Sequence, residues 1–145
     1  EGELTIAVIA VANAAKSAVE ATALHLAVAP HADYRAMLWT RLEKLYTARA
    51  VFRRRHIRGS SEEWEFDAAV EREGRMSLFE VIPPHSNAVN SAVTKFLDIR
   101  DLGEIAPNRV AVLVKKDATP HLTVLARTAQ IVGSDDPDEV YRQAA

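Results

Sequence analysis

The sequence predicts one α/β domain in which a mixed sheet is flanked by helices. Three observations favour this class. An amphipathic helical pattern precedes the strands, three strand-like segments follow with short turns between them, and a further strand comes after a helix. Strands joined by short turns form an antiparallel meander, whereas a strand reached through a helix is typically parallel to its neighbour. The 145 residues are enough for one domain with a real core.

The first helix of this domain and the three strands of the meander come in sequence order. Apolar side chains three and four apart predict a helix over residues 33–46, and the composition of residues 49–57 predicts a strand. Another strand is expected over residues 76–82, after a turn at Gly74. In the strand between these two, every second residue is apolar, so these side chains are expected to share one face of the sheet. They are Trp64, Phe66, Ala68 and Val70.

The second half of the domain alternates helices and strands. Helical spacing predicts a helix over residues 86–98, with Ser86 or Asn87 as its N-cap. The β-branched run over residues 109–114 predicts a buried strand parallel to a neighbour. Residues 122–128 fit either a helix or a strand by periodicity, and a helix is favoured. The remaining expected elements are a short strand over residues 130–132 and a helix that Asp136 caps.

The N-terminal part of the chain differs from the rest. Residues 4–28 are rich in alanine and apolar on nearly every helical face, which predicts a long helix that must be covered on several sides. We therefore expect residues 1–30 to be an interface or linker element and residues 31–145 to be the α/β domain. A second copy in a homodimer, or a preceding domain of a longer protein, is the expected cover. Charged and polar residues interrupt the segment, so no membrane span is expected and the predicted location is cytoplasmic.

The composition excludes several kinds of site. There is no cysteine, so disulfides, thiolate zinc sites and cysteine nucleophiles are excluded. A net charge of −2 gives no overall attraction to nucleic acid or to an anionic membrane. The sequence has no glycine-rich phosphate loop and no serine nucleophile motif. Among the scattered histidines, His85 is the one candidate for catalysis, because it follows the third strand close to Glu80. The alternative, and the commoner role at such a position, is a helix-entry or loop residue.

Two carboxylates form the main candidate site. Asp67 lies in the second strand and Glu80 in the third, so pairing through the turn at Gly74 would bring them together. Carboxylates on neighbouring strands offer the hard oxygen ligands that Mg²⁺ or Mn²⁺ prefers, and Glu43 could add a third. The alternative is an acidic face that is simply solvated.

A basic segment precedes the acidic strand. Residues 41–58 contain seven basic residues and one acidic residue. Opposite charges across a strand ladder attract, so cross-strand pairing is one interpretation. Phosphate binding by outward-facing arginines is the other. The candidate nucleic-acid-binding residues are Arg53, Arg54, Arg55 and Arg58.

The order of elements and the acidic pair resemble the αβββαβ core of the restriction-endonuclease-like, or PD-(D/E)XK, superfamily. The resemblance implies that Asp67 and Glu80 bind the metal and that a lysine two residues after the glutamate assists the chemistry. Ile82 stands at that position and cannot orient or deprotonate a water molecule. Some members take the basic residue from the following helix, where Lys95 is the only lysine, and periodicity predicts that Lys95 faces away from the apolar stripe.

Three short motifs carry a second resemblance. They are Ile57-Arg58-Gly59-Ser60-Ser61, Phe66-Asp67 and Lys95-Phe96-Leu97-Asp98-Ile99. Over roughly residues 35–132 the chain is similar to a family of uncharacterised C-terminal domains of bacterial and prophage proteins. This similarity implies that an N-terminal domain precedes the sequence. It implies a fold more than a function.

The functional expectation follows from the missing lysine. We expect a catalytically degenerate nuclease-like module that is used for nucleic-acid-associated or protein interaction. One alternative is a weak Mg²⁺- or Mn²⁺-dependent nuclease that uses Asp67 and Glu80, with Lys95 as the basic residue. Another is a structural oligomerisation domain that assembles through residues 4–28.

Overall fold

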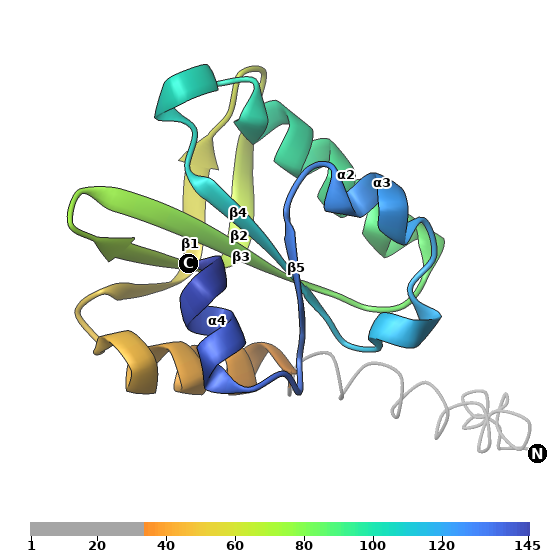
Figure 1. The fold of residues 1–145 in the computed structure, drawn as a ribbon. Coiled ribbons are helices and arrows are strands. Elements are labelled where there is room, and N and C mark those ends of the chain that lie inside the picture. The colour runs from red at the N-terminus through yellow and green to blue at the C-terminus, as the bar shows by residue number, and fades with distance from the viewer. Residues whose placement is uncertain (1–33) are drawn as a thin grey trace, which may run out of the picture. The chain divides into compact units, whose positions relative to one another are not determined.

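The computed structural model describes residues 34–145 (Figure 1). The predicted helix and interface over residues 4–28 lie outside the described residues. Within the described residues, no helix is long and apolar enough to cross a membrane.

The described chain forms a five-stranded mixed sheet with helices on both faces, which confirms the predicted α/β class. The sheet order is β1-β2-β3-β4-β5, in which the first three strands are antiparallel and the last three are parallel. The elements are a helix over residues 34–46, β1 (Val51–Arg58), β2 (Glu63–Arg72), β3 (Arg75–Ile82), α2 (Ser86–Arg100), β4 (Asn108–Leu113), α3 (Leu122–Ala126), β5 (Gln130–Gly133) and α4 (Asp138–Ala144). Short 3₁₀ turns at Gly103–Ile105 and Lys116–Ala118 flank β4.

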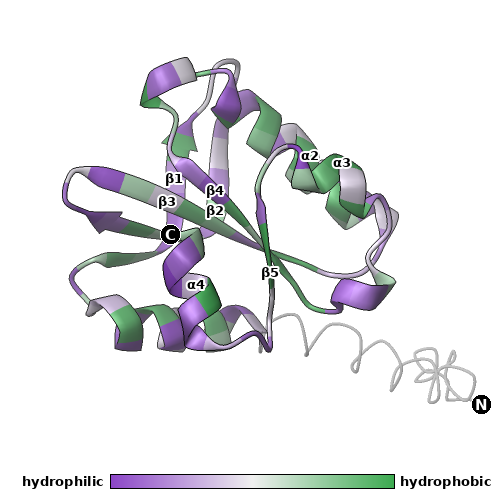
Figure 2. Cartoon of the chain, in the orientation of Figure 1, coloured by the Kyte–Doolittle hydropathy of each residue, from purple (hydrophilic) through white to green (hydrophobic). Residues whose placement is uncertain are grey.

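Two apolar clusters hold the layers together. On one face, the helix of residues 34–46 and α4 pack through Leu42 and Tyr141. On the other face, α2 and α3 pack through Phe96 and Leu125 (Figure 1). The inner strand β4, between β3 and β5, is buried on both faces, and its apolar residues form a continuous run (Figure 2). Each such side chain contributes about 1.5–3 kcal/mol on burial.

The alternation of side chains along β1 and β2 is interrupted at one position, contrary to the prediction for β2. Ala68 and Val70 face the helix of residues 34–46, but Phe66 and Trp64 belong to the α2 side of the sheet. The reversal falls at Asp67. Opposite it on β1, Arg54 has a positive φ of 56°, a backbone conformation that residues with a Cβ rarely adopt. Because both strands reverse at the same level, their register is kept on either side of it.

Two helix starts differ from the predicted caps. His85, not Ser86 or Asn87, is the N-cap of α2, and its Nδ1 accepts a hydrogen bond from the main-chain N–H of Ala88 at 3.3 Å. Asp136 does not cap α4, because its carboxylate accepts the N–H of Gly133 instead, at 2.7 Å.

Asp98 ties α2 to the turn between β1 and β2. Its carboxylate accepts hydrogen bonds from the indole N–H of Trp64 at 2.8 Å and from the main-chain N–H groups of Ser61 and Glu62. These bonds, that of Trp64 above all, lower the pKa of Asp98 to about 2. Gly59 lies so close that a Cβ there would come within 2.4 Å of an Asp98 carboxylate oxygen. Two of the short motifs of the sequence, residues 57–61 and 95–99, are therefore in contact through Gly59 and Asp98.

We predict that Gly59→Ala destabilises the domain by about 1–3 kcal/mol, because the added methyl group must displace the Asp98 carboxylate or the turn. Urea unfolding measures the change. Ser60→Ala, at the exposed neighbouring position, is the matched control and should stay within about 0.5 kcal/mol of the wild type. Equal stability of Gly59→Ala and wild type would contradict the tight contact.

Candidate active site

Asp67 and Glu80 lie where strands β2 and β3 separate. The ladder between these strands ends at the pair Ala68 and Phe79, one position before the two carboxylates would face each other. From there, each carboxylate binds the main chain of the opposite strand. The N–H of Val81 donates to Asp67 Oδ2 at 2.8 Å, and the N–H of Asp67 donates to Glu80 Oε1 at 3.2 Å. The two carboxylates are therefore held close together, as their strand positions predict.

The main chain of Asp67 is held by side chains on both sides. Its N–H binds Glu80, and its carbonyl oxygen accepts the indole N–H of Trp39 at 2.7 Å. Neither group is then available to a strand ladder, and neither Arg54 nor Glu80 forms a ladder pair with Asp67. This arrangement explains both the reversal of side-chain alternation and the separation of the strands.

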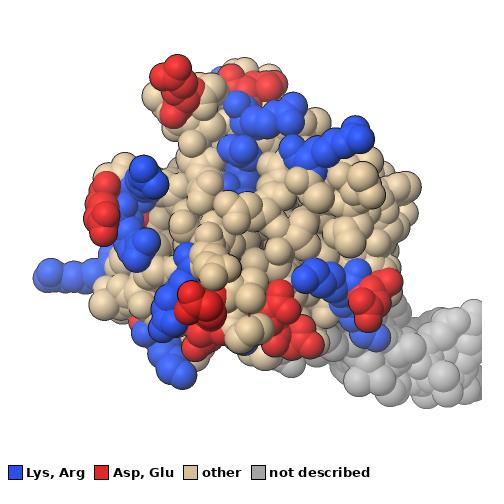
Figure 3. Space-filling model, in the orientation of Figure 1, with Lys and Arg blue, Asp and Glu red and all other residues tan. Residues whose placement is uncertain are grey.

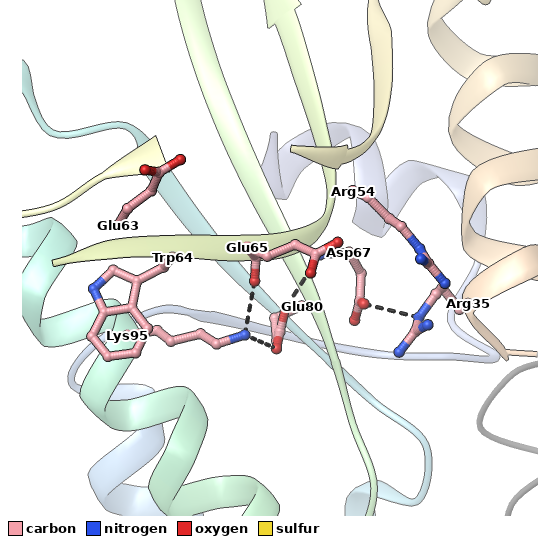
Figure 4. A pocket seen from close by; sticks show the side chains of 8 residues that line it. All are labelled: Arg35, Arg54, Glu63, Trp64, Glu65, Asp67, Glu80 and Lys95. Atoms are coloured by element: carbon pink, nitrogen blue, oxygen red, sulfur yellow. Dashed lines mark hydrogen bonds and ion pairs between the residues drawn. The ribbon is translucent and has the colours of Figure 1, made fainter. Parts of the chain in front are cut away.

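Two cations complete the partners of the carboxylate oxygens (Figure 4). Lys95 Nζ lies 2.7 Å from Glu80 Oε2, and Arg35 Nε lies 2.9 Å from Asp67 Oδ1. The Arg35 contact is an ion pair without hydrogen-bond geometry, and the buried Arg35 Nε has no hydrogen-bond partner among the described residues. In the described structure, each of the four carboxylate oxygens therefore has one partner.

Lys95 faces the site, contrary to the prediction that it points away. The stacking of Phe96 on Phe66, with ring centroids 6.0 Å apart, seats α2 against the outer half of β2. Lys95 then extends along the strand, with its Nζ 5.4 Å from the centroid of the Phe66 ring and 2.8 Å from the carbonyl oxygen of Glu65. The prediction failed because it treated only the apolar stripe as facing the sheet. A long lysine at the edge of that stripe reaches the sheet as well.

These side chains line an open hollow of about 400 Å³ (Figure 4). Lys95 enters from the α2 side, whereas Arg35 and Arg54 enter from the side of Asp67 that faces the helix of residues 34–46. The lining residues are Arg35, Arg54, Glu63, Trp64, Glu65, Asp67, Glu80 and Lys95.

The negative charge of Glu80 lies in unfavourable surroundings. Burial raises the pKa of the Glu80 carboxyl to about 7, and repulsion by Asp67 acts in the same direction. Lys95 opposes this shift but does not cancel it. Strongly shifted carboxyl groups in a hollow are typical of functional sites, although structural ion pairs also produce them.

The other predicted site residues lie in different surroundings. Glu43 does not join the pair, because it binds Arg53 through both carboxylate oxygens. Arg55 pairs with Glu71 at 3.0 Å, and Arg58 donates to the carbonyl oxygen of Ser61. His85 caps α2 and does not line the hollow.

Two residues of the site had no signal in the sequence. Arg35 and Trp39 lie one turn apart on the helix of residues 34–46, and their contacts with Asp67 span about thirty positions of the chain. Helical spacing places them on the same side of that helix, but nothing in the spacing says which strand they meet.

The donor set fits a hard divalent cation in kind, with only two carboxylates to hold it. Within residues 34–145, no group of three or more carboxylate or histidine side chains is arranged to hold a metal ion. Asp67 and Glu80 remain the possible ligands. Mg²⁺ commonly binds through one or two carboxylates and completes its shell with water and substrate phosphate oxygens.

Comparisons with known proteins leave the family open. No family model matches the sequence, and no curated protein matches it. A crystal structure of a protein of unknown function, AF1548, is similar over 72% of this chain, with 14% identity and a TM-score of 0.49. The matched part spans 61% of that protein's chain. A likeness of this degree decides neither the fold family nor the function.

We predict that Glu80 makes the domain less stable as the pH rises. The folded protein holds the Glu80 proton up to about pH 7, whereas the ordinary pKa is 4.5. Between these values the folded state binds more protons than the unfolded state, so stability falls with rising pH. Relative to Glu80→Gln, the wild type should lose about 1–3 kcal/mol across this window. Urea unfolding at several pH values gives the free energy of unfolding of both proteins. The contribution of the histidines to its pH dependence cancels in the difference, because both proteins contain the same histidines. A constant difference across the window would contradict the shifted pKa.

Proposed function

We propose that the chain is a divalent-metal-dependent nuclease with a restriction-endonuclease-like site formed by Asp67, Glu80 and Lys95. One observation carries the proposal: Lys95 Nζ lies 2.7 Å from Glu80 Oε2 at the point where β2 and β3 separate. The sequence favoured a degenerate module, because Ile82 replaces the lysine of the third strand. A lysine that reaches the same carboxylate from α2 removes the reason for that preference.

The order of the strands supports the same proposal. An antiparallel β1-β2-β3 meander, a helix and a parallel β4 follow one another as in the αβββαβ core that the sequence resembles. The carboxylates lie on the second and third strands of that meander, with their side chains in one hollow. The likeness to the PD-(D/E)XK superfamily remains part of the proposal.

The site residues have separate roles in this proposal. A Mg²⁺ or Mn²⁺ ion held by Asp67 and Glu80 would polarise a phosphoryl oxygen and help to activate water. The main-chain N–H groups of Val81 and Asp67 hold one oxygen of each carboxylate in place, so a metal ion would have to displace Arg35 from Asp67 but not these two bonds. The Lys95 ammonium group can donate to the attacking water or to a phosphate oxygen, and it stabilises negative charge that develops there.

The distribution of surface charge bears on where a nucleic acid would bind. On the face seen in Figure 3, lysine and arginine side chains lie in separate groups, several of them beside acidic side chains. That face therefore carries no continuous basic field for a nucleic acid, and the net charge of −2 gives no overall attraction to one. In this proposal, attraction of a phosphate backbone comes from the hollow itself and from the cation that it would hold.

We predict Mn²⁺-dependent cleavage of labelled single- or double-stranded DNA that is lost in Asp67→Ala. Lys95→Met should lower the cleavage rate by roughly 10²–10⁴-fold, because it removes a positioned proton donor and its charge. Gel analysis of a fluorescent strand measures both effects.

Lys115→Met is the matched control, because Lys115 is an exposed lysine outside the hollow. Its rate should equal that of the wild type. Absence of cleavage, or equal cleavage by the wild type and Asp67→Ala, would exclude the enzyme and leave the interaction module that the sequence first suggested.

A further inference from the structure

We propose that Arg54, together with Arg35, forms a subsite for a backbone phosphate of DNA next to the metal-binding carboxylates. This inference rests on the proposed function, because it assigns the ligand of the same hollow. The phosphate bound at this subsite is not the reacting phosphate, so a binding measurement can test the subsite separately from cleavage.

The contrast between three consecutive arginines points to Arg54. Arg53 pairs with Glu43 at 3.0 Å and lies over the Trp39 ring. Arg55 pairs with Glu71 at 3.0 Å and lies over the Phe52 ring. Among the described residues, Arg54 makes no ion pair, yet its side chain lines the hollow. The two outer charges are therefore matched within the domain, and the middle one is directed to the site.

The strained backbone of Arg54 directs its side chain into the hollow. A φ of 56° in the middle of a strand costs roughly 1–3 kcal/mol for a residue with a Cβ. The same conformation reverses the alternation of β1, so that Arg53 faces Trp39 on the helix of residues 34–46, while Arg55 lies over Phe52 of the α2-side cluster. Arg54, at the reversal, points into the hollow beside Asp67 (Figure 4).

The distribution of charge in the hollow favours an anion at this end. Arg35 and Arg54 lie on the same side of the hollow, and of the two only Arg35 pairs with Asp67. The whole lining contains three basic and four acidic side chains, so a divalent cation would change its net charge from −1 to +1. A cation on Asp67 would also compete with Arg35, whose contact with Asp67 lacks hydrogen-bond geometry. Arg35 and Arg54 would then offer two planar guanidinium groups to one phosphate, which suits bidentate hydrogen bonding.

Binding measured without turnover tests the subsite. Fluorescence anisotropy of a labelled single-stranded DNA is recorded with Ca²⁺ in place of Mg²⁺, over a series of salt concentrations. Arg54→Gln should weaken binding roughly tenfold at about 0.1 M salt and reduce the slope of log K against log salt by about 0.7, the value for one lost phosphate contact on a single strand. Arg54→Lys keeps the charge, so it should keep the slope while binding more weakly than the wild type.

Arg53→Gln is the matched control on the same strand, because Glu43 already balances that charge. Its slope should equal that of the wild type. Equal slopes for Arg54→Gln and wild type, equal losses in Arg53→Gln and Arg54→Gln, or no DNA binding by the wild type would each overturn the subsite. DNA binding that depends on Arg54 without any Mn²⁺-dependent cleavage would instead overturn the nuclease and keep the subsite.

Discussion

The rest of the site depends on two hydrogen bonds between β2 and β3, from the N–H of Val81 to the Asp67 carboxylate and from the N–H of Asp67 to the Glu80 carboxylate. Each carboxylate accepts a main-chain N–H from the opposite strand, and these contacts take the place of the ladder that would otherwise continue between β2 and β3. A buried carboxylate without such donors would be costly, since its charge leaves water for a poorer environment. The separation of the strands therefore brings the two acids together and also makes their burial tolerable.

Three side chains of α2 transmit this constraint to the helical layer. Lys95 binds Glu80, Phe96 stacks on Phe66, and Asp98 accepts hydrogen bonds from Trp64 and the turn before β2. They fall within four consecutive residues, so a shift of α2 along the sheet would disturb all three contacts at once. The motif Lys95-Phe96-Leu97-Asp98-Ile99 thus describes how α2 is seated on β2.

Much of the fold could be predicted from the sequence, because local rules govern it. The turn at Gly74 set the register that brings Asp67 and Glu80 together, and the run 109–114 identified the buried parallel strand as β4. The reversal at Arg54 and Asp67 could not be predicted. It depends on Trp39 and Glu80, two side chains remote in sequence that take the main-chain bonds of Asp67 away from the ladder. Period-two alternation assumes an uninterrupted ladder, so it placed Phe66 and Ala68 on the same face.

The same limit applies to the candidate site. Residue type and strand position were sufficient to choose the acidic pair, but the partners of its oxygens depend on how the helices pack. Lys95 was placed on the wrong side because a helical wheel gives the direction of the Cβ and not the reach of a long side chain. Arg35 was missed because helical spacing does not say which strand its helix meets. For the basic strand, neither charge pairing nor an outward phosphate-binding face describes all the arginines. Arg53 and Arg55 are paired with acidic side chains, whereas Arg54 is directed to the hollow.

Anomalous diffraction from a crystal soaked in Mn²⁺ would test the central claim most directly. If Asp67 and Glu80 bind the metal, one strong peak is expected between their carboxylates, with Arg35 moved away from Asp67. Density that shows no peak there, with Arg35 and Lys95 still paired to the two carboxylates as they are in the described structure, would contradict it. The four charges would then be a buried ion-pair network that holds β2, β3 and α2 together.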